Sequence, residues 1–261
     1  MMEAALPDRQ TSDGFPAVDF LADALFLDID GTLIDIAPTP ESVVVPESLK
    51  LSLVRVREQL AGALAVISGR TLSAIDELFA PVKFAAAGAH GAEIRLGPNS
   101  EVERYAPILG SAEKAALAEI VKLGPRLRLE DKVYTMAIHY RLAPELEDAV
   151  FEAAKREVGK LQENLRILRG KAVIEVKHRG FNKGTGLCEL MKHFPFAGRR
   201  PIFLGDDTTD QDAMAVMPHF AGLGISVGQR LAGAHRQVSS PAEVRRWLAG
   251  LAGLNRQTDR S

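Results

Sequence analysis

The sequence predicts an α/β protein that consists of a parallel sheet with covering helices and a second, α+β unit inserted into the same chain. Short apolar runs at residues 24–27, 63–67, 84–87 and 201–204 each end in small or charged residues, which is typical of buried parallel strands. Between about residues 105 and 180, helical spacing is followed by alternating apolar and polar residues, which is typical of half-exposed antiparallel strands. We therefore expect a second domain within the first.

Length and composition exclude several classes of protein. The chain has 261 residues, 46% of them apolar and 25% charged, so it can bury a sizeable core. A formal net charge of -2 argues against a nucleic acid or an anionic membrane as partner, because both attract clustered Lys and Arg. No apolar run is long enough to span a bilayer, and the first twenty residues are too polar for a signal peptide. The expectation is a cytoplasmic monomer with no nucleic-acid or membrane partner.

The first predicted strand, residues 24–27, delivers two carboxylates to the edge of the sheet. Asp28 and Asp30 follow it, and Gly31 allows a tight turn at which backbone N–H groups can approach an anion. A surface turn explains Asp30 and Gly31 but leaves Asp28 on a buried strand end, where an unpaired carboxylate costs roughly 2 to 7 kcal/mol. A bound cation would relieve that cost.

A helix is predicted over residues 47–61, because apolar residues recur there at helical spacing. The strand at residues 63–67 then ends in Ser68, Gly69 and Arg70, and Thr71 is the expected N-cap of the next helix. A serine hydroxyl, free helical N–H groups and a guanidinium at one point suit an anion. An ordinary strand-to-helix turn is the alternative for this stretch alone.

The third strand, residues 84–87, ends in a segment with paired glycines that contains His90 and Gly91. Such glycines indicate close approach of the backbone, and His90 would reach the same edge of the sheet as Asp28 and Ser68. A structural histidine is the alternative. We expect His90 to contact a substrate.

The inserted segment has the order helix, two strands, helix, two strands. Alternating strands are predicted at residues 127–130, 136–141, 165–168 and 172–176, with a helix over residues 144–161 between the two pairs. The unit is expected to act as a lid over the site.

The pattern of the first domain returns with a helix predicted from Asn182 to about residue 194. Lys183 in its first turn is not favoured by the helix dipole unless it faces an anion or a carboxylate. The strand at residues 201–204 ends in Asp206, Asp207 and Asp210. A last strand at residues 222–227 and a closing helix that begins near residue 240 complete the domain.

The acidic residues after the strand at residues 201–204 need separate explanations. Asp210 can be the N-cap of the following helix, whereas Asp206 and Asp207 have no such role. Acidic clusters at two strand ends without His or Cys suit a hard, oxygen-seeking cation, and Mg²⁺ is the usual one beside phosphate. Residues 1–22 are predicted to be a loose lead-in.

Four groups of residues resemble, in chain order, the four motifs of the haloacid dehalogenase superfamily of phosphohydrolases. They are Asp28 with Asp30, then Ser68, then Lys183, and then the aspartates after residue 205. The segments I-S-G-R, G-A-H-G-A-E, L-E-D-K, I-H-Y-R, V-I-E-V-K and G-D-D-T-T-D further resemble the bacterial trehalose-6-phosphate phosphatase family. One departure is Gln211, where that family usually has Glu.

The resemblance implies a Rossmann-like haloacid dehalogenase core, residues 1–104 and 181–261, with an inserted α/β cap, residues 105–180. It also implies Mg²⁺-dependent hydrolysis of a small-molecule sugar phosphate, trehalose 6-phosphate, through an aspartyl-phosphate. The implied catalytic residues are Asp28 as nucleophile, Asp30 as general acid and base, and Ser68 and Lys183 as contacts to the phosphoryl group. The implied metal site comprises Asp28, Asp30 through its carbonyl, Asp206 and Asp207, with Asp210 in support. The implied substrate contacts are Gly69, Arg70, His90 and Gly91 in the core and Glu130, Lys132, Arg141 and Glu175 in the cap.

Several alternatives stay open. A phosphatase of sucrose phosphate or mannosyl-phosphoglycerate, or a phosphomutase, would share this core. A non-catalytic sugar-phosphate sensor would be marked by loss of Asp28, Asp30 or Lys183, and all three are present. Glu130, Lys132 and Glu175 could be a solvated cross-strand ion pair, which contributes only about 0 to 1 kcal/mol.

Overall fold

The computed structural model describes residues 14–36, 43–161, 164–170 and 172–254. The chain divides into two compact units. The core unit comprises residues 1–103 and 183–261, and the inserted unit comprises residues 104–182.

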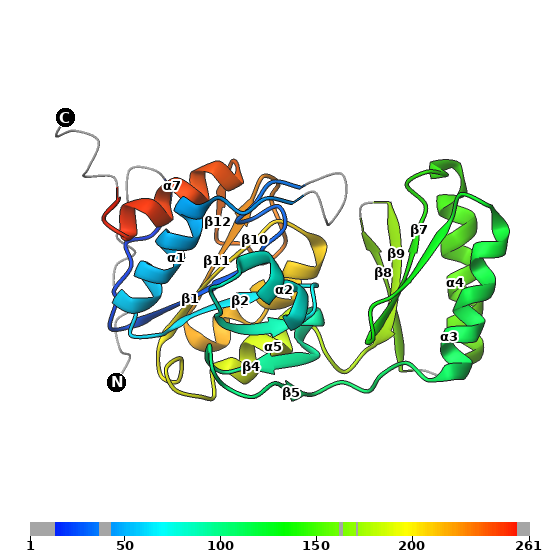
Figure 1. Ribbon diagram of the computed structural model, residues 1–261, viewed down its shortest axis with the longest axis horizontal. Coiled ribbons are helices and arrows are strands. Elements are labelled where there is room, and N and C mark those ends of the chain that lie inside the picture. The colour runs from blue at the N-terminus through cyan, green and yellow to red at the C-terminus, as the bar shows by residue number, and fades with distance from the viewer. Residues whose placement is uncertain (1–13, 37–42, 162–163, 171, 255–261) are drawn as a thin grey trace. The chain divides into compact units, whose positions relative to one another are not determined.

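The core unit is built on an eight-stranded sheet with the order β12-β11-β10-β1-β2-β3-β4-β5 (Figure 1). Its parallel strands are β1 (Asp23–Leu27), β2 (Leu64–Ile67), β3 (Ala85–Gly88), β10 (Arg200–Gly205), β11 (Leu223–Val227) and β12 (Arg236–Val238). β4 (Glu93–Arg95) runs antiparallel to β3, and β5 (Glu103–Arg104) is the edge strand. β1 lies between β10 and β2, and all five of its residues are buried. The predicted fold class is confirmed.

Helices cover this sheet. α1 (Glu47–Gln59) and α7 (Pro241–Leu251) lie side by side over one face, and α5 (Lys183–Leu190) lies on the other side of the strands and packs on α6 (Gln211–Met214) (Figure 1). α2 (Leu72–Phe79) follows β2. The described residues of this unit also form short 3-10 turns at η2 (Ala89–Gly91), η5 (Thr208–Asp210) and η6 (Met217–Phe220).

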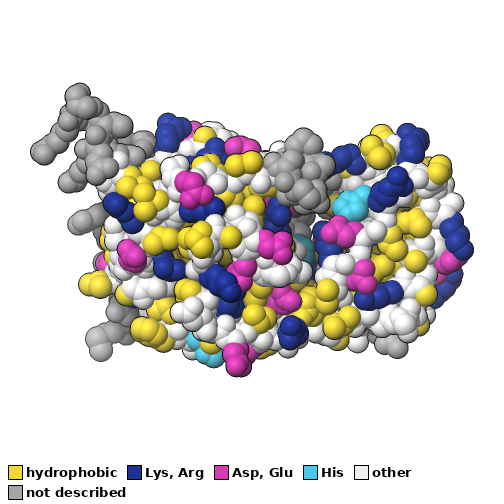
Figure 2. Space-filling model, viewed as in Figure 1, with side chains coloured by type: hydrophobic (Ala, Val, Ile, Leu, Met, Phe, Trp, Pro, Cys, Tyr) yellow, Lys and Arg dark blue, Asp and Glu magenta, His cyan; other side chains and the backbone are white. Residues whose placement is uncertain are grey.

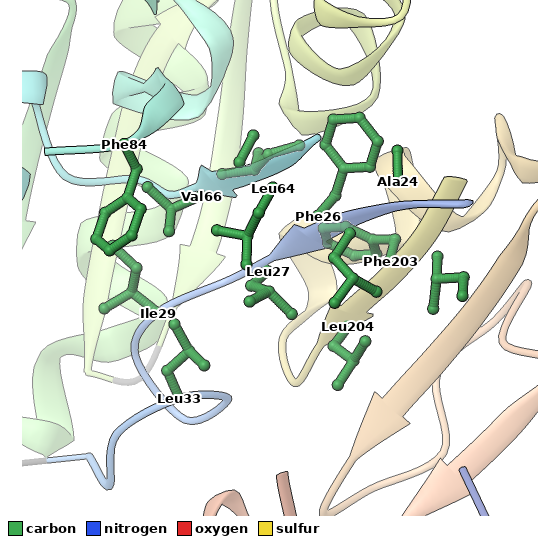
Figure 3. Close-up of a cluster of buried hydrophobic side chains, with 14 of the residues drawn as sticks. Ala24, Phe26, Leu27, Ile29, Leu33, Leu64, Val66, Phe84, Phe203 and Leu204 are labelled. Carbon is green, nitrogen blue, oxygen red and sulfur yellow. The ribbon is translucent and has the colours of Figure 1, made fainter. Parts of the chain in front are cut away.

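The apolar core surrounds β1. Figure 3 shows the side chains of Phe26 and Leu27 packed with residues of the two neighbouring strands. Those neighbours are Leu64 and Val66 from β2 and Phe203 and Leu204 from β10. Because β1, β2, β3 and β10 are mutually parallel, their carboxyl ends meet at one edge of the sheet. The residues after these ends are therefore brought together.

The inserted unit contains a four-stranded antiparallel sheet with the order β6-β7-β9-β8. The strands are β6 (Arg128–Asp131), β7 (Thr135–His139), β8 (Leu165–Gly170) and β9 (Val173–His178). Its helical elements are α3 (Ser111–Ala118), η3 (Glu119–Leu123), η4 (Pro144–Leu146) and α4 (Glu147–Leu161). Met136, Ile138, Ile174 and Val176 form a buried apolar face of the sheet, in one cluster with residues of α3 and α4. The alternation predicted from the sequence is confirmed.

Two local predictions are wrong. The helix expected to reach residue 194 ends at Leu190, and a residue that precedes proline, as Phe194 does before Pro195, is disfavoured in helical geometry. The predicted loose lead-in is partly ordered, because Phe15 is buried and stacks on Trp247 with ring centroids 4.8 Å apart. Residues 1–13 lie outside the described residues.

The surface carries both signs of charge. On the face shown in Figure 2, basic and acidic side chains are intermingled over the described residues, in keeping with the small net charge of -2. Within the described ranges, no helix is both long and apolar enough to cross a membrane.

An ion pair joins strand β4 of the core sheet to a helix. Both terminal nitrogens of Arg95 on β4 contact the Asp76 carboxylate on α2, at 2.7 and 2.6 Å, and this interaction lowers the pKa of Asp76. We expect Arg95→Met to lower the free energy of unfolding by about 1 to 3 kcal/mol at neutral pH, because it removes two charge-assisted hydrogen bonds from a half-buried carboxylate and leaves only Lys83 Nζ, 3.5 Å from Asp76 Oδ2, as a cationic partner. Lys122→Met, in an exposed pair with Glu119, is the control and should cost under about 1 kcal/mol.

The pH dependence of this effect has a defined sign. Because the pKa of Asp76 in the folded state lies below its ordinary value of 3.8, the pair stabilises the protein above that pH. This stabilisation is lost as the pH falls through the folded-state pKa. Urea denaturation at several pH values should therefore show a difference between wild type and Arg95→Met that shrinks in acid. A difference independent of pH would contradict the assignment.

Candidate active site

A buried ammonium and two carboxylates form the centre of the site. Lys183 Nζ, in the first turn of α5, lies 2.7 Å from Asp28 Oδ1 and 2.6 Å from Asp210 Oδ1. The three side chains are at most 5% exposed, so each charge depends on the others for compensation. Asp28 follows β1 and Asp210 ends η5, so three distant segments of the chain meet here.

The second oxygen of Asp210, Oδ2, binds the backbone of the loop that follows β10. It accepts hydrogen bonds from the backbone N–H groups of Asp206 and Asp207, both at 2.9 Å. A Cβ atom at Gly205 would lie 2.4 Å from Asp210 Cγ, so this approach requires glycine. Asp210 occupies the predicted N-cap position of α6, but its side chain makes no cap hydrogen bond to that helix. Asp207 caps η5 instead, through the N–H of Thr208.

The electrostatics of this cluster favour an additional cation. Burial raises the pKa of Asp28 well above its ordinary value, and repulsion from Asp210 and Asp206 adds to this, while Lys183 opposes it. Burial alone would lower the pKa of Lys183, but Asp210 and Asp28 outweigh it and raise that pKa, so the ammonium stays charged. Two carboxylates thus contact one ammonium and a third lies beside them, which favours an additional positive charge.

The donor atoms of the cluster suit a hard metal ion. Asp28, Asp206 and Asp210 are buried and each offers an oxygen, and these oxygens lie within 4.8 Å of one another. Such an all-oxygen set fits Mg²⁺ better than softer metals. Both oxygens of Asp210 accept hydrogen bonds, from Lys183 and from two backbone N–H groups, so Asp28 and Asp206 are the better candidates for metal ligands.

At Gly31 the backbone of the loop after β1 lies directly against the side chain of Asp206. The φ of Gly31 is +86°, and a Cβ atom there would lie 2.1 Å from Asp206 Oδ2. Any side chain at position 31 would therefore displace the Asp206 carboxylate.

Asp30 lies outside the acidic cluster and is paired with Arg70. Arg70 Nε donates to Asp30 Oδ2 and Arg70 Nη2 to Asp30 Oδ1, both at 2.7 Å. The sequence predicted that this guanidinium would reach a substrate oxygen. In the structure one edge of the guanidinium, with Nε and Nη2, donates to the carboxylate of Asp30, which follows the neighbouring strand β1.

Ser68 and His90 join the ends of β2 and β3. Ser68 is buried, its Oγ accepts from the N–H of Arg70 at 3.2 Å, and its carbonyl accepts from the N–H of His90 at 2.9 Å. The His90 ring lies against Gly69, where a Cβ atom would be 2.7 Å from Nε2. His90 has a left-handed φ of +58°, followed by +93° at Gly91. Strained backbone of this kind is common at functional sites.

Sequence reasoning missed two residues that support these loops. The Glu93 carboxylate accepts from the N–H of Leu72 at 2.8 Å, so it stabilises the start of α2 together with the predicted N-cap Thr71. Gln229 Nε2 donates to the Asp206 carbonyl at 3.1 Å. The G-A-H-G-A-E segment already contained Glu93, whereas nothing in the local pattern indicated Gln229.

In the inserted unit, a polar cluster lies on the sheet face opposite the apolar one. Lys132 Nζ is 2.8 Å from Glu175 Oε1 and 3.8 Å from Glu130 Oε2, so the predicted convergence of these three charges is confirmed. Strand register explains it, because Ala137 on β7 lies between Glu130 on β6 and Glu175 on β9. We call this the cap cluster.

His139 is a member of the cap cluster that sequence reasoning missed. Its Nε2 lies 2.9 Å from Glu130 Oε2, and this hydrogen bond is the main cause of the lowered pKa of Glu130. The sequence did contain a signal for it. His139 lies two residues after Ala137 on an alternating strand, so its side chain is on the same face of the sheet as Glu130. Arg141 follows β7 and is exposed.

Comparison with known proteins gives consistent matches over most of the chain. The sequence model of the family described as trehalose-phosphatase matches residues 26–243. The trehalose-6-phosphate phosphatase of Escherichia coli is 35% identical over 86% of this chain and 85% of its own length. A protein of Sinorhizobium fredii named as a probable trehalose-phosphate phosphatase is 38% identical over 89% of this chain and 88% of its own length.

Solved structures show the same fold. The C-terminal domain of the Candida albicans trehalose-6-phosphate phosphatase superposes with a TM-score of 0.78 at 21% identity, over 89% of this chain and 92% of that domain. A phosphatase of the haloalkanoate superfamily from Bacteroides thetaiotaomicron superposes with a TM-score of 0.63 at 16% identity, over 94% of this chain and all of the other. At these identities the structures establish the fold alone.

Proposed function

Because the chain belongs to the trehalose-phosphatase family, we propose that it hydrolyses trehalose 6-phosphate to trehalose and phosphate. The observation that carries this proposal is the buried Asp28–Lys183–Asp210 cluster beside Asp206. It has a nucleophile, an ammonium that can meet a phosphoryl oxygen, and an excess of carboxylates for a cation.

In the proposed reaction Asp28 attacks phosphorus and forms an aspartyl-phosphate. Lys183 holds Asp28 Oδ1, which orients the other oxygen for attack. Asp28, Asp206 and the Asp30 carbonyl would hold Mg²⁺, which when bound offsets the repulsion between the nucleophile and the phosphoryl oxygens. Asp207 and Asp210 support this site, and the hydrogen bonds that Asp210 accepts from backbone N–H groups of the loop after β10 favour a supporting role for it.

Asp30 is the proposed general acid and base. It gives a proton to the departing sugar oxygen and later takes one from the water that attacks the aspartyl-phosphate. Its carboxylate is partly exposed, unlike that of Asp28, so a leaving group and water can reach it. Ser68 and Lys183 are proposed to contact the phosphoryl oxygens, and Gly69, His90 and Gly91 the neighbouring part of the substrate.

We assign the inserted unit to substrate specificity. The cap cluster offers an ammonium with two carboxylates within 4 Å of it, and such groups form charge-assisted hydrogen bonds with sugar hydroxyls. Glu130, Lys132 and Glu175 are thus the proposed contacts to the distal glucose, with Arg141 a further candidate. Closure of a cap over the core would also exclude water from Asp28.

Phosphate release from a panel of sugar phosphates tests the proposed function. Trehalose 6-phosphate should exceed sucrose phosphate, glucose 6-phosphate and mannosyl-phosphoglycerate in kcat/KM by about 100-fold or more, as expected when buried polar groups match substrate hydroxyls. Equal rates on all four would contradict specificity for trehalose 6-phosphate. Isomerised sugar phosphate in place of free phosphate would indicate a phosphomutase.

A second expected result concerns the metal. Chelation should abolish turnover, Mg²⁺ should restore it, and Mg²⁺ should raise the Tm of the wild type, because a ligand that binds only the folded state stabilises it. Asp206→Asn should lose the shift in Tm, whereas Asp35→Asn, an exposed aspartate paired with Arg245, should keep it. Full activity after exhaustive chelation would remove Mg²⁺ from the mechanism.

A further inference from the structure

Arg70 and Asp30 form an ion pair that the sequence analysis did not predict. Two nitrogens of one guanidinium bind the two oxygens of one carboxylate, both at 2.7 Å. Asp30 follows β1 and Arg70 follows β2, so the pair connects two neighbouring strand ends. A bidentate pair fixes the orientation of the carboxylate as well as its position.

Hydrogen bonds hold the backbone of Arg70 and of the residues that follow it in place. The N–H of Arg70 donates to Ser68 Oγ at 3.2 Å, and its carbonyl accepts from the N–H of Ala89 at 2.7 Å. Two residues later, the N–H of Leu72 is held by the Glu93 carboxylate. The backbone that carries the guanidinium is therefore attached to η2, which follows β3, and to β4 as well as to its own strand.

Asp30 needs such a partner if it is to transfer a proton. Its side chain is 39% exposed, and without Arg70 the carboxylate could rotate about both of its side-chain torsions. Proton transfer requires one oxygen within about 2.6 to 3.2 Å of the leaving oxygen. The guanidinium occupies one lone-pair site on each carboxylate oxygen, which leaves a second site on each for the proton.

We propose that Arg70 is a positioning residue that orients the Asp30 carboxyl group for proton transfer to the leaving sugar oxygen. This inference rests on the proposed function. In the step concerned, a bond forms between an oxygen of Asp28 and phosphorus, and the bond from phosphorus to the sugar oxygen breaks. The proton of Asp30 moves to the sugar oxygen, which keeps the electron pair of the broken bond.

The proposal predicts a dependence on the leaving group. A sugar alkoxide is a poor leaving group and needs the proton, phenolate needs it less, and para-nitrophenolate departs without it. Loss of the correct orientation should therefore slow the three substrates to different extents. A residue that merely maintained the fold would affect them equally.

The test compares wild type with Arg70→Lys, which keeps the positive charge but cannot bind a carboxylate in bidentate fashion. We would measure kcat/KM for trehalose 6-phosphate, phenyl phosphate and para-nitrophenyl phosphate, since this constant covers only the steps up to release of the first product. Expected losses are about 100-fold for the sugar phosphate, an intermediate value for phenyl phosphate and less than about 3-fold for para-nitrophenyl phosphate. Equal losses on all three, or none, would overturn the proposal.

The chain offers a matched control at the other end of β1. Arg200 binds Asp23 with Nε and Nη2 at 2.8 and 3.0 Å, again one nitrogen to each carboxylate oxygen. Arg200→Lys should change the three kcat/KM values by a common factor or leave them unchanged. A graded loss in this variant would show that the effect is not specific to Asp30, and would overturn the proposal.

Asp30→Asn separates failure of this inference from failure of the proposed function. A graded loss in Asp30→Asn but not in Arg70→Lys overturns the positioning role alone. No graded loss in either overturns the acid role of Asp30 as well. In the double variant, Arg70→Lys should add less than about a 2-fold loss on trehalose 6-phosphate to that of Asp30→Asn, because both changes affect one interaction. An additional loss equal to that of the single variant would contradict the proposal.

Discussion

Asp28→Asn is expected to abolish turnover of trehalose 6-phosphate, with a loss in kcat of about 10⁵-fold or more, because removal of a covalent nucleophile leaves only binding and electrostatic contributions. The measurement is phosphate release at saturating substrate with Mg²⁺ present. Sugar-phosphate binding, followed by calorimetry, should be retained, since the amide keeps the shape of the carboxylate and an oxygen for Lys183.

The fold of this variant should survive. Asp28, Asp206 and Asp210 are buried carboxylates around one ammonium, so removal of one negative charge relieves repulsion in the metal-free protein. We expect the Tm of chelated Asp28→Asn to equal or exceed that of chelated wild type. Asp35→Asn is the control for the chemical change, and its activity should stay within about 2-fold of wild type, as for most surface substitutions. Near-normal turnover by Asp28→Asn would refute the nucleophile assignment.

Variants of the cap cluster are expected to have the second largest effect, and a selective one. Glu175→Gln, Lys132→Met and Glu130→Gln should each lower kcat/KM for trehalose 6-phosphate by about 100-fold, because each removes a charge-assisted hydrogen bond to the sugar and alters the ion pairs that hold the neighbouring charges in place. Hydrolysis of para-nitrophenyl phosphate, which has no sugar to contact, should stay within about 3-fold of wild type.

The inserted unit provides a suitable control for these variants. Lys160 and Glu157 form an exposed pair on α4, and Lys160→Met should leave both activities unchanged. The Tm of every variant should be recorded, since Glu175 is nearly buried and its partner Lys132 depends on it. If both substrates lose activity equally while the Tm is unchanged, the cap cluster does not determine specificity.

The fold and most of the site could be predicted because their determinants are local. Apolar runs mark the strands of a buried parallel sheet, and polar residues after them must appear at its carboxyl edge. Asp28, Ser68 and Asp206 were found in this way, and Lys183 from its unfavourable place at a helix start. Alternation in the insert also placed Glu130 and Lys132 on one face, which the cap cluster confirms.

Side-chain partners could not be predicted in the same way. Local propensity suggested that Asp210 caps α6, but its carboxylate turns back to the N–H groups of Asp206 and Asp207, and the helix starts without a side-chain cap. The same limit applies to Phe15, which lies in a segment with no periodicity but is buried and stacks on Trp247, 232 residues away in the sequence.

The sequence by itself determined the α/β class, the inserted unit and the kinds of charge delivered to the edge of the sheet. Only the tertiary structure decided which charges neutralise one another. Lys183 binds Asp28, 155 residues away, and Arg70 binds Asp30, 40 residues away. The physical reason is that residue periodicity encodes which face of an element a side chain occupies, whereas a charged partner is selected by distance and burial between segments that meet only after folding.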